Sequence, residues 1–479
     1  MSIRSLYWFT NDLRISDNPL LAQAAQNSHQ LTCCYLIPSL TPLDQRFQVV
    51  ASNGLAKQRF LLESLADLDA KLQTLGQSLQ IATGEAVSQL CQFIELTEAN
   101  HLYVSESVDF AIHQTLREVR LRYPQLTVVS LNTHRLFEQA ELPFSLAALP
   151  DSFSVFRKQV ESLDGRYSSQ SARWNNDITA LPPSVLPSSS SWLSTAIRSI
   201  NLELRSSPLW RGGESAALEH LEDYFSSDAP LIYKQTRNAL DEWESSTKFS
   251  SWLANGCLSI GRLLARLNDY ETQRGANEST YWIYFELLWR EYFQWYALKY
   301  GAQLFQFSGI KGQVPLTSYY PQRMRSWING TTPYPIVNAA MKQLKATGYL
   351  SNRSRQLVAS CLVHELSIDW RYGAQYFQSQ LIDYDVASNW GNWQYLAGVG
   401  ADPRGHRRFD LAKQTALYDP ELRFIRHWQG EADQHSIDVV WLIGLSLQRN
   451  KRTIIVQAWR HSLFVIILID STHLLARLS

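Results

Sequence analysis

The strongest constraint on the fold is an alternation of short apolar runs and amphipathic stretches in the first 132 residues. Strand followed by helix, repeated along the chain, predicts a doubly wound parallel α/β sheet. No GxGxxG motif follows the first run, so the pattern itself identifies no ligand. One helix is expected in "RFLLESLADLDAKLQTLG", where leucines at helical spacing end at Gly76. Five runs have the continuous hydrophobicity of buried strands: "LYWF" (6–9), "LTCCYLI" (31–37), "LQIAT" (79–83), "HLYVSE" (101–106) and "LTVVSLN" (126–132).

A linker and a helical region follow. From about residue 143 to residue 205 the periodicity fades, and "ALPPSVLPSSSSW" has the Pro and Ser content of a surface linker. Beyond residue 210, stretches such as "STYWIYFELLWREYFQWYALKYG" carry apolar residues three and four positions apart, which is typical of helices. A chain of 479 residues is also too long for one ordinary domain. We therefore expect an α/β domain (1–135), an interdomain linker (136–205) and an all-α domain (206–428).

The last segment, residues 429–479, differs in character and is left unassigned. It contains "LFVIILI", which has no polar face and is shorter than the about 20 residues that span a bilayer. A strand, a partner-binding segment and a poorly packing stretch all remain open for it.

Composition narrows the class of protein further. The 44 basic and 44 acidic residues balance, so contact with a nucleic acid would need a local basic patch. The five cysteines are odd in number and form no CxxC motif, which predicts reduced thiols in the core. "MSIRSLYWF" lacks the apolar core of a signal peptide, so we expect a cytoplasmic protein. Most of the 16 Trp are expected to be ordinary core residues.

Two motifs bring acids close to other functional groups. Glu286 and Arg290 stand four positions apart in a helical stretch, which predicts an intrahelical ion pair. In "IDYDVASNWGNWQYLAGVG", Asp383 and Asp385 precede a helical pattern rich in Trp, Asn and Gly. Helix capping is an ordinary role for these two acids, and ligand binding is the alternative.

A third motif, "YLSNRSRQL", places Asn352, Arg353 and Arg355 at a helix start. Exposed N–H groups and guanidinium groups at such a position suit a phosphate. Capping of the helix by Ser351 or Asn352 is the equally ordinary interpretation.

Together and in this order, these motifs resemble the photolyase and cryptochrome family, most closely its cryptochrome DASH branch. The resemblance runs from Leu6 to Trp428. It implies an α/β antenna domain joined by a long linker to a helical FAD-binding domain. The matching motifs are "LYWFTNDLRISDNPLL", "YKQTRN", "STKFSSWLANGCLS", "FELLWREYF", "YPIVNAAM", "SNRSRQ", "IDWR" and "IDYDVASNWGNWQY".

The resemblance implies a U-shaped FAD in the helical domain. Asp383 and Asp385 would bond the flavin ring's polar edge and the ribose, and Asn389 would face N5, where an amide both donates and accepts. Arg355 would lie against the ring as a permanent cation. The positions that match the family's FAD-binding residues are Tyr233, Thr247, Lys248, Phe249, Ser250, Glu286, Arg290, Asn352, Arg355, Asp383, Asp385 and Asn389.

The activity implied is light-driven repair of cyclobutane pyrimidine dimers, a deoxyribodipyrimidine photo-lyase reaction that requires no metal. Glu286 and Asn352 match the groups that bond the dimer, and Trp289 and Tyr395 match those that stack on it. Tyr395 stands where duplex-active photolyases carry Trp, which is similar to the DASH branch. That branch prefers single-stranded DNA. Weak binding of the dimer would not offset the cost of unstacking it from a duplex, whereas a single strand has little stacking to lose.

Electron supply is where the sequence departs from the family. The family reduces its flavin through three Trp, and two of them match Trp393 and Trp370. The third position holds Thr317, with Tyr319 and Tyr320 as the nearby substitutes. We therefore expect impaired photoreduction of the oxidised flavin.

A second chromophore, 5,10-methenyltetrahydrofolate, is implied as a light-harvesting antenna. Glu106 lies where a folate-binding acid is expected, although a solvated acid at a strand end is the ordinary alternative.

The expected partner is single-stranded DNA that contains pyrimidine dimers, bound by a monomer. A rival function is a blue-light photoreceptor that signals through a partner without repair. Basic residues that either follow a DNA backbone or form a solvated surface are Arg353, Arg404, Arg407, Arg408 and Lys413.

Overall fold

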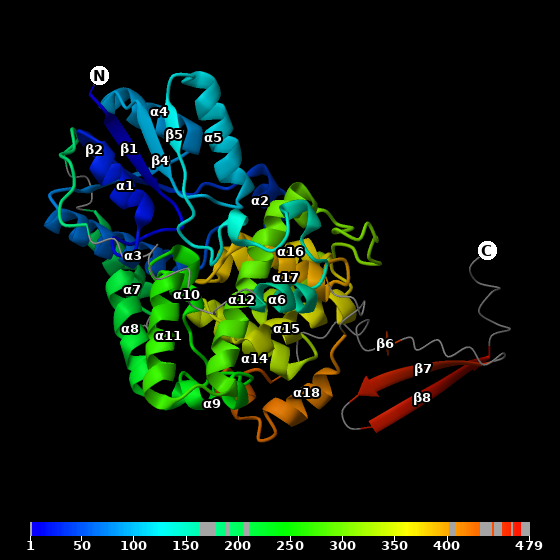
Figure 1. Cartoon of the computed structure of the whole chain (residues 1–479). Coiled ribbons are helices and arrows are strands. Elements are labelled where there is room, and N and C mark those ends of the chain that lie inside the picture. Colours follow the sequence, from blue (N-terminus) through cyan, green and yellow to red (C-terminus); the bar gives the residue numbers. More distant parts are fainter. Residues whose placement is uncertain are drawn as a thin grey trace.

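The N-terminal part of the protein is built on a parallel five-stranded sheet (Figure 1). The computed structural model describes residues 2–162, 178–187, 192–204, 210–401 and 408–431, and the backbone of 443–444, 453–460 and 463–470. The strand order is β3-β2-β1-β4-β5, and every neighbouring pair in it is parallel. The doubly wound α/β prediction is confirmed. The strands are β1 (Arg4–Phe9), β2 (Gln30–Ile37), β3 (Leu79–Thr83), β4 (His101–Val104) and β5 (Thr127–Val129).

Alternate residues of the central strand serve the two faces of this sheet. Leu6 and Trp8 pack with the apolar sides of α4 and α5, whereas Tyr7 and Phe9 belong to the larger core that contains α1 and α3. Because successive strand side chains point to opposite faces, a strand buried on both sides reads as one continuous apolar run. The helices are α1 (Pro19–Asn27), α2 (Pro42–Phe47), α3 (Leu55–Thr74), α4 (Ala86–Thr97) and α5 (Phe110–Arg122).

The fourth and fifth strands are shorter than the sequence pattern predicts. β4 ends at Val104 instead of Glu106, and β5 covers three residues of the predicted 126–132. Polar contacts replace sheet pairing at this point, since the hydroxyl oxygens of Ser105 and Thr133 lie 2.5 Å apart. The loop after β4 therefore starts at the carboxyl edge of the sheet, the edge that binds ligands in such folds.

The expected linker contains helices of its own. They are η1 (Gln139–Glu141), η2 (Leu146–Ala148), α6 (Phe153–Glu161) and α7 (Leu193–Leu204). α6 buries Phe153, Phe156 and Val160, whose spacing places them on one face of the helix. α7 packs against α3. The sequence did not predict these elements because each is short: η1 and η2 have three residues each, α6 has nine and α7 has twelve.

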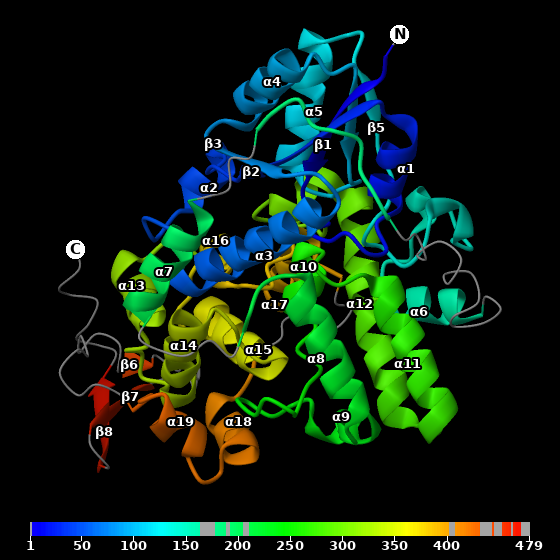
Figure 2. The same ribbon diagram turned by 90° about the vertical axis from the view of Figure 1, so that its left-hand side faces the viewer.

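The rest of the chain to residue 431 is helical, and the prediction of an all-α second part is confirmed (Figure 2). Its elements are α8 (Glu214–Ser226), α9 (Ala229–Thr236), α10 (Ser250–Asn255), α11 (Ile260–Arg274), α12 (Glu278–Tyr300), η3 (Gly301–Phe305), α13 (Pro321–Asn329), α14 (Pro335–Thr347), α15 (Asn352–Ser360), the π-helix η4 (Cys361–Glu365), α16 (Trp370–Gln380), α17 (Val386–Leu396), α18 (Leu411–Tyr418) and α19 (Arg423–His427).

A buried arginine joins the α/β part to the helical part. Arg14 follows β1 and donates to the carbonyl oxygens of Gly256 (3.0 Å), Asp17 (2.9 Å) and Thr133 (2.8 Å). Gly256 has φ +70°, and a Cβ there would collide with the backbone carbonyl of Asn11. This position therefore requires glycine both for its backbone conformation and for the close approach of the two parts.

A buried carboxylate fixes the start of the linker to the long helix α12. Glu291 is fully buried and accepts hydrogen bonds from the backbone N–H groups of Leu136 (2.8 Å) and Phe137 (3.2 Å). The indole N–H of Trp295 donates to the same carboxylate (2.6 Å). Burial raises the pKa of Glu291, and these hydrogen bonds together with nearby arginines oppose that rise. The linker is thus attached to the helix that carries several of the predicted site residues.

Three further sequence predictions can be compared with the fold. All five cysteines are reduced and buried, as expected. Within the described residues, no helix is long and apolar enough to cross a membrane. "LFVIILI" forms a strand, one of the alternatives left open for it, and this strand is β8 (Leu463–Asp470). β8 pairs antiparallel with β7 (Thr453–Arg460), and β7 pairs antiparallel with the short β6 (Ile443–Gly444). The domain boundaries at residues 135, 205 and 428 remain predictions.

Candidate functional site

The predicted site residues come from elements that pack together in the helical part. α12 packs against α9 and α17, and α17 packs against α15 and α16. Close packing of α17 on α12 depends on Gly391, because a Cβ at this position would collide with the ring of Phe293. The glycine of the motif "SNWGNW" therefore serves the contact between these two helices.

An ion pair joins two of the predicted flavin-binding residues. Arg355, in the first turns of α15, donates through Nη2 to Asp383 Oδ2 (2.7 Å), and its Nε donates to the Leu350 carbonyl oxygen (2.9 Å). The Ser250 hydroxyl donates to the same oxygen of Asp383 (2.7 Å). Burial alone would lower the pKa of Arg355, but the Asp383 carboxylate outweighs it and raises the pKa. Asp383 Oδ1 is buried without a hydrogen-bond partner, so one acceptor is left over for a ligand.

Asp385 has the capping role that the sequence left open. Its side chain accepts from the backbone N–H of Ser388 (2.7 Å) at the start of α17 and from Gln294 Nε2 (2.8 Å). Asn389, one turn into α17, is buried and donates to the Ala374 carbonyl oxygen (3.0 Å). Gln294 is fully buried on α12. Its role was not predicted from the sequence, because only the packing of α12 on α17 brings it to Asp385.

Lys248 is a buried cation next to Phe249 and Ser250, two of the predicted FAD-binding residues. It has the unusual backbone φ of +55°, and its ammonium lies 5.1 Å from the ring centroid of Tyr349. No ion pair joins it to any residue that the structure describes. Burial lowers the pKa of Lys248 to about 8, since the charged form loses its hydration there. An anionic ligand at this position would supply the missing partner, as the pyrophosphate of FAD would.

An aromatic cluster packs against the segment that carries Lys248. His220 donates through Nε2 to the Thr247 carbonyl oxygen (2.9 Å), and its ring stacks on Trp252 (5.0 Å between centroids). Phe249 is buried against the same histidine (5.3 Å). Tyr233 is buried as well. His220 was not predicted as a site residue, because its partners Thr247 and Trp252 lie about 30 positions later in the chain.

Glu286 does not form the predicted ion pair with Arg290. Its carboxylate pairs instead with Arg237, just beyond the end of α9, while Arg290 donates to the His134 carbonyl oxygen (2.7 Å). The prediction was wrong because α9 packs along α12 and brings a closer guanidinium to the carboxylate. Burial raises the pKa of Glu286, and Arg237 opposes that rise. Arg237 was missed, although it lies four positions after Tyr233 in the matched motif "YKQTRN".

Trp289 and Tyr395 lie next to each other with their rings nearly perpendicular. Their centroids are 6.2 Å apart and the planes meet at 76°. One face of Trp289 stacks on Phe153 of the linker helix α6. Asn352 is exposed at the first position of α15, where Ser351 supplies the N-cap.

The two predicted electron-transfer tryptophans have different aromatic neighbours. Trp393 contacts Trp327 (6.4 Å) and Phe377 (5.1 Å), and Trp370 contacts Trp390 (5.8 Å). Each of these contacts has rings close to perpendicular. Both predicted residues are buried in the helical core.

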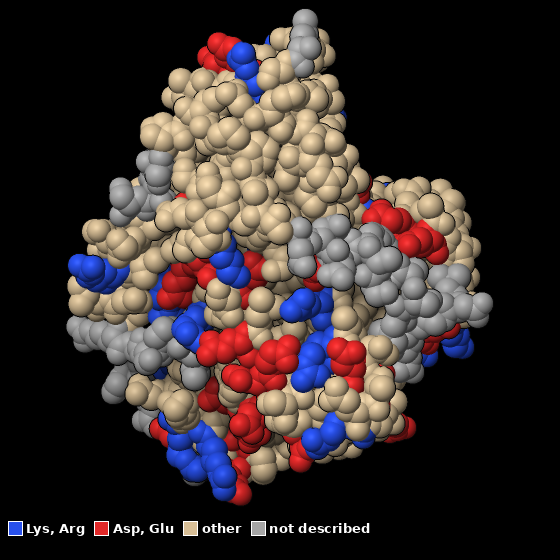
Figure 3. Space-filling model, turned by 60° about the vertical axis from the view of Figure 1, so that its left-hand side comes forward, with Lys and Arg blue, Asp and Glu red and all other residues tan. Residues whose placement is uncertain are grey.

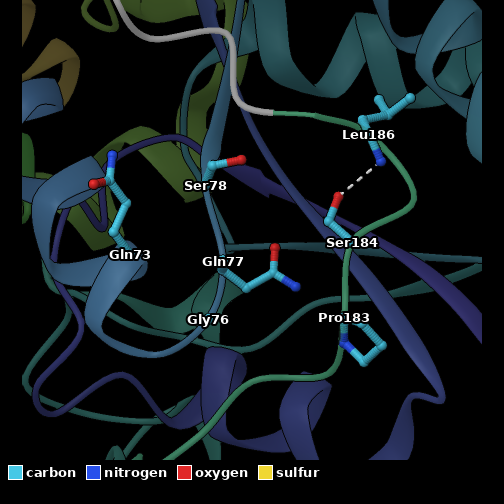
Figure 4. A pocket seen from close by; sticks show the side chains of 7 residues that line it. All are labelled: Gln73, Gly76, Gln77, Ser78, Pro183, Ser184 and Leu186. Carbon is cyan, nitrogen blue, oxygen red and sulfur yellow. Dashed lines mark hydrogen bonds between the residues drawn. The ribbon is translucent and has the colours of Figure 1, made fainter.

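Glu106, the candidate antenna residue, already has a cationic partner. It forms an ion pair with Arg135, whose guanidinium carbon lies 4.7 Å from the ring centroid of Trp295. With 39% of its side chain exposed, Glu106 remains accessible at the carboxyl edge of the sheet. A distinct cavity of about 430 Å³ lies at the linker side of the α/β part and includes none of the predicted residues (Figure 4). It is lined by Gln73, Gly76, Gln77, Ser78, Pro183, Ser184 and Leu186.

The charged surface has no region of a single sign on the face seen in Figure 3, where Lys and Arg are interspersed with Asp and Glu. Of the basic residues that the sequence analysis considered for DNA binding, Arg408 pairs with Glu365 (2.8 Å). Arg353 donates to Asn238 Oδ1 (3.0 Å) and lies over the ring of Tyr418. Arg404 and Arg407 lie outside the described residues.

Comparisons with known proteins agree with this geometry. The profile of the family described as "FAD binding domain of DNA photolyase" matches residues 282–460, and that of "DNA photolyase" matches residues 5–173. The chain is 51% identical over 437 residues to a protein named cryptochrome DASH from Idiomarina loihiensis, covering 91% of this chain and 94% of the relative. It is 48% identical to a cryptochrome DASH from Vibrio parahaemolyticus, covering 92% and 96%.

Solved structures show the same similarity. The crystal structure of a cryptochrome from Synechocystis sp. superposes with a TM-score of 0.79 at 35% identity and covers 89% of each chain. A bacterial class III photolyase from Agrobacterium tumefaciens superposes with a TM-score of 0.73 at 26% identity and covers 89% of this chain and 86% of its own.

Proposed function

Because the chain belongs to the photolyase and cryptochrome family, in its cryptochrome DASH branch, we propose that it repairs cyclobutane pyrimidine dimers in single-stranded DNA with light. The protein is a photolyase-like flavoprotein with an FAD-binding domain. We further propose that it acts as a monomer in the cytoplasm. The observation that carries the proposal is the packing of α12 on α17, which brings Trp289 next to Tyr395 (6.2 Å) and Gln294 to Asp385 (2.8 Å) at the start of the same helix.

The fit of FAD rests on groups that lack partners in the protein alone. Lys248 is a buried cation that an FAD phosphate would neutralise, and Asp383 Oδ1 is a buried acceptor for a ring or ribose donor. Asp385 and Asn389 would hold other polar atoms of the cofactor from the start of α17. Arg355, kept charged by Asp383, would favour a negative ring beside it. Bound FAD, when reduced and excited by light, supplies the electron that opens the cyclobutane ring.

The pyrimidine dimer would be held by Trp289, Tyr395 and Glu286. Two perpendicular rings form a corner, and the two bases of a cyclobutane dimer are themselves not coplanar, so each ring can contact one base. The Glu286 carboxylate accepts a hydrogen bond from a base N–H, and its partner Arg237 brings positive charge near the dimer. These contacts stabilise the extra electron on the dimer without a protein nucleophile.

Single-stranded DNA is the better substrate for such a site. Flipping a dimer out of a duplex costs a few kcal/mol, and a phenol at position 395 offers less stacking surface than an indole to offset that cost. A single strand loses little stacking on entry. The direct test is light-driven repair of a thymine dimer by the protein after chemical reduction of its FAD.

Reduction of the flavin by light is expected to be inefficient in the wild-type protein. Position 317 is Thr, and the exposed Tyr319 stacks on Tyr372 (4.2 Å, 26°), two residues after Trp370. We expect Tyr319→Phe to slow photoreduction further, because it removes the exposed phenol that is oxidised last. Tyr320→Phe is the matched control, since that phenol is equally exposed but lies under Arg323 (4.3 Å). A long-lived distal tryptophanyl radical in transient absorption would contradict this expectation.

A folate antenna is also proposed, at the carboxyl edge of the sheet. Glu106 follows β4 there and is partly exposed beside Arg135. A carboxylate of this kind can accept hydrogen bonds from the N–H groups of a pterin. Fluorescence of the purified protein after release of its chromophores distinguishes a folate from FAD.

A further inference from the structure

The linker helix α6 is attached to the part of α12 that carries the proposed lesion site. Arg157 donates to the Tyr281 hydroxyl (3.3 Å), and this hydroxyl donates to Glu161 Oε1 (2.6 Å). Phe156 is fully buried and contacts the ring of Tyr292 (5.3 Å). Figure 2 shows α6 beside α12. A segment that links the two domains in sequence is therefore a fixed layer on α12.

The first residue of α6 stacks directly on Trp289. The ring centroids of Phe153 and Trp289 lie 3.7 Å apart, and their planes differ by 12°. Phe153 is itself held edge-on by Phe285 (5.2 Å, 86°) and Tyr292 (6.0 Å, 70°), and only 5% of it is exposed. Neither ring can turn without losing this stack, so Phe153 fixes the plane of the Trp289 indole.

Among the described residues, Trp289 has three further ring contacts. They are with Tyr395 (6.2 Å, 76°), Phe293 (5.7 Å, 29°) and Tyr292 (6.1 Å, 80°). Trp289 is only partly buried, and since Phe153 covers one of its faces, we take the part beside Tyr395 as the surface that a ligand meets. The angle between these two rings therefore depends on a residue of the linker.

We propose that Phe153 is a positioning residue of the lesion site, acting through Trp289 to hold the aromatic corner in the shape that a pyrimidine dimer fits. The inference rests on the proposed function. Without the stack, the indole gains rotational freedom that must be lost again on binding. Ordering one such side chain weakens affinity by about 2- to 10-fold.

The experiment measures the affinity of the FAD-loaded protein for a single strand with one thymine dimer and for the undamaged strand. Phe153→Leu keeps an apolar side chain but removes the flat face, and Phe153→Tyr keeps the ring. Phe156→Leu alters the same helix face without a stack on Trp289. We expect about 2- to 10-fold weaker dimer binding for Phe153→Leu, with the affinity restored in Phe153→Tyr and unchanged in Phe156→Leu.

Two further readouts separate positioning from general damage. Binding of the undamaged strand and the repair yield per absorbed photon at saturating dimer are expected to be unchanged in Phe153→Leu. Wild-type affinity in Phe153→Leu, or an equal loss in Phe156→Leu, would overturn the inference. A wild-type protein that does not prefer the dimer-containing strand would instead reject the proposed function itself.

Discussion

The Lys248→Met variant is expected to bind FAD about 10- to 150-fold more weakly than the wild type, whereas its flavin-free form becomes more stable. A hydrogen bond to a charged group contributes about 1.5–3 kcal/mol, which sets this range for the loss of the phosphate contact. In the flavin-free protein the same ammonium is buried and forms no ion pair with a described residue. Asp241 and Glu242 only partly oppose the effect of burial, so removal of the charge relieves a penalty. Titration of the apoprotein with FAD and chemical denaturation of both apoproteins measure the two effects.

The gain in stability is expected to depend on pH in a defined direction. The pKa of Lys248 falls from 10.5 in the unfolded chain to about 8 in the folded protein, so the unfolded chain binds more protons between these values. The wild-type apoprotein therefore carries the full penalty, about 3 kcal/mol, below pH 8 and loses it as the pH rises to 10.5. The difference in unfolding free energy between variant and wild type should shrink over the same interval.

A second lysine provides a matched control for this prediction. Lys57 on α3 also has a pKa lowered to about 8 by burial, and it lies over the ring of Tyr384 (4.8 Å) rather than beside the proposed phosphate site. Lys57→Met is expected to retain FAD. Equal loss of FAD in both variants, or tight FAD binding by Lys248→Met, would contradict the assignment of Lys248 to a phosphate.

The Glu286→Ala variant is expected to bind a dimer-containing single strand about 10- to 150-fold more weakly at saturating FAD. The variant loses a charge-assisted hydrogen bond to the base and leaves Arg237 without its carboxylate partner. The measurement is the affinity for damaged relative to undamaged strand. The loss should therefore appear in the discrimination between the two strands and not only in general DNA binding.

Glu278→Ala is the matched control on the same helix. Glu278 lies two turns before Glu286 and also pairs with a cation of α9, Lys234 (2.8 Å), but 82% of its side chain is exposed. Exposed ion pairs contribute little, so this variant should keep the wild-type affinity. Full discrimination by Glu286→Ala would exclude its carboxylate from the lesion site.

Local pattern predicted the parallel strands and the long helices, but not the short linker helices or the partners of the charged residues. The apolar runs around Leu6 and Cys33 predicted buried parallel strands, because both sides of these strands meet a core. The Glu286 carboxylate pairs with a guanidinium 49 positions earlier in the chain, and helical spacing alone favoured Arg290. The packing of α9 on α12 brings Arg237 to Glu286 and so determines which arginine pairs with this carboxylate.

The candidate site shows the same division. The motif around Asp383 predicted a cluster of acids at a helix start, and capping by Asp385 is the local part of that prediction. The ion pair of Asp383 with Arg355, 28 positions earlier, and the stack of Phe153 on Trp289 depend on three-dimensional contacts. Phe153 was not predicted at all, since the linker that contains it lacks a long periodic pattern.

The most direct test of the proposed function is light-driven loss of a thymine dimer from matched single-stranded and duplex oligonucleotides. The FAD is reduced chemically beforehand, so that the result does not depend on the third electron-transfer Trp, which is replaced by Thr317 in this chain. We predict repair of the single strand and little or no repair of the duplex. Absence of repair in both, with FAD fully bound, would contradict the proposed activity and favour a light sensor that signals through a partner.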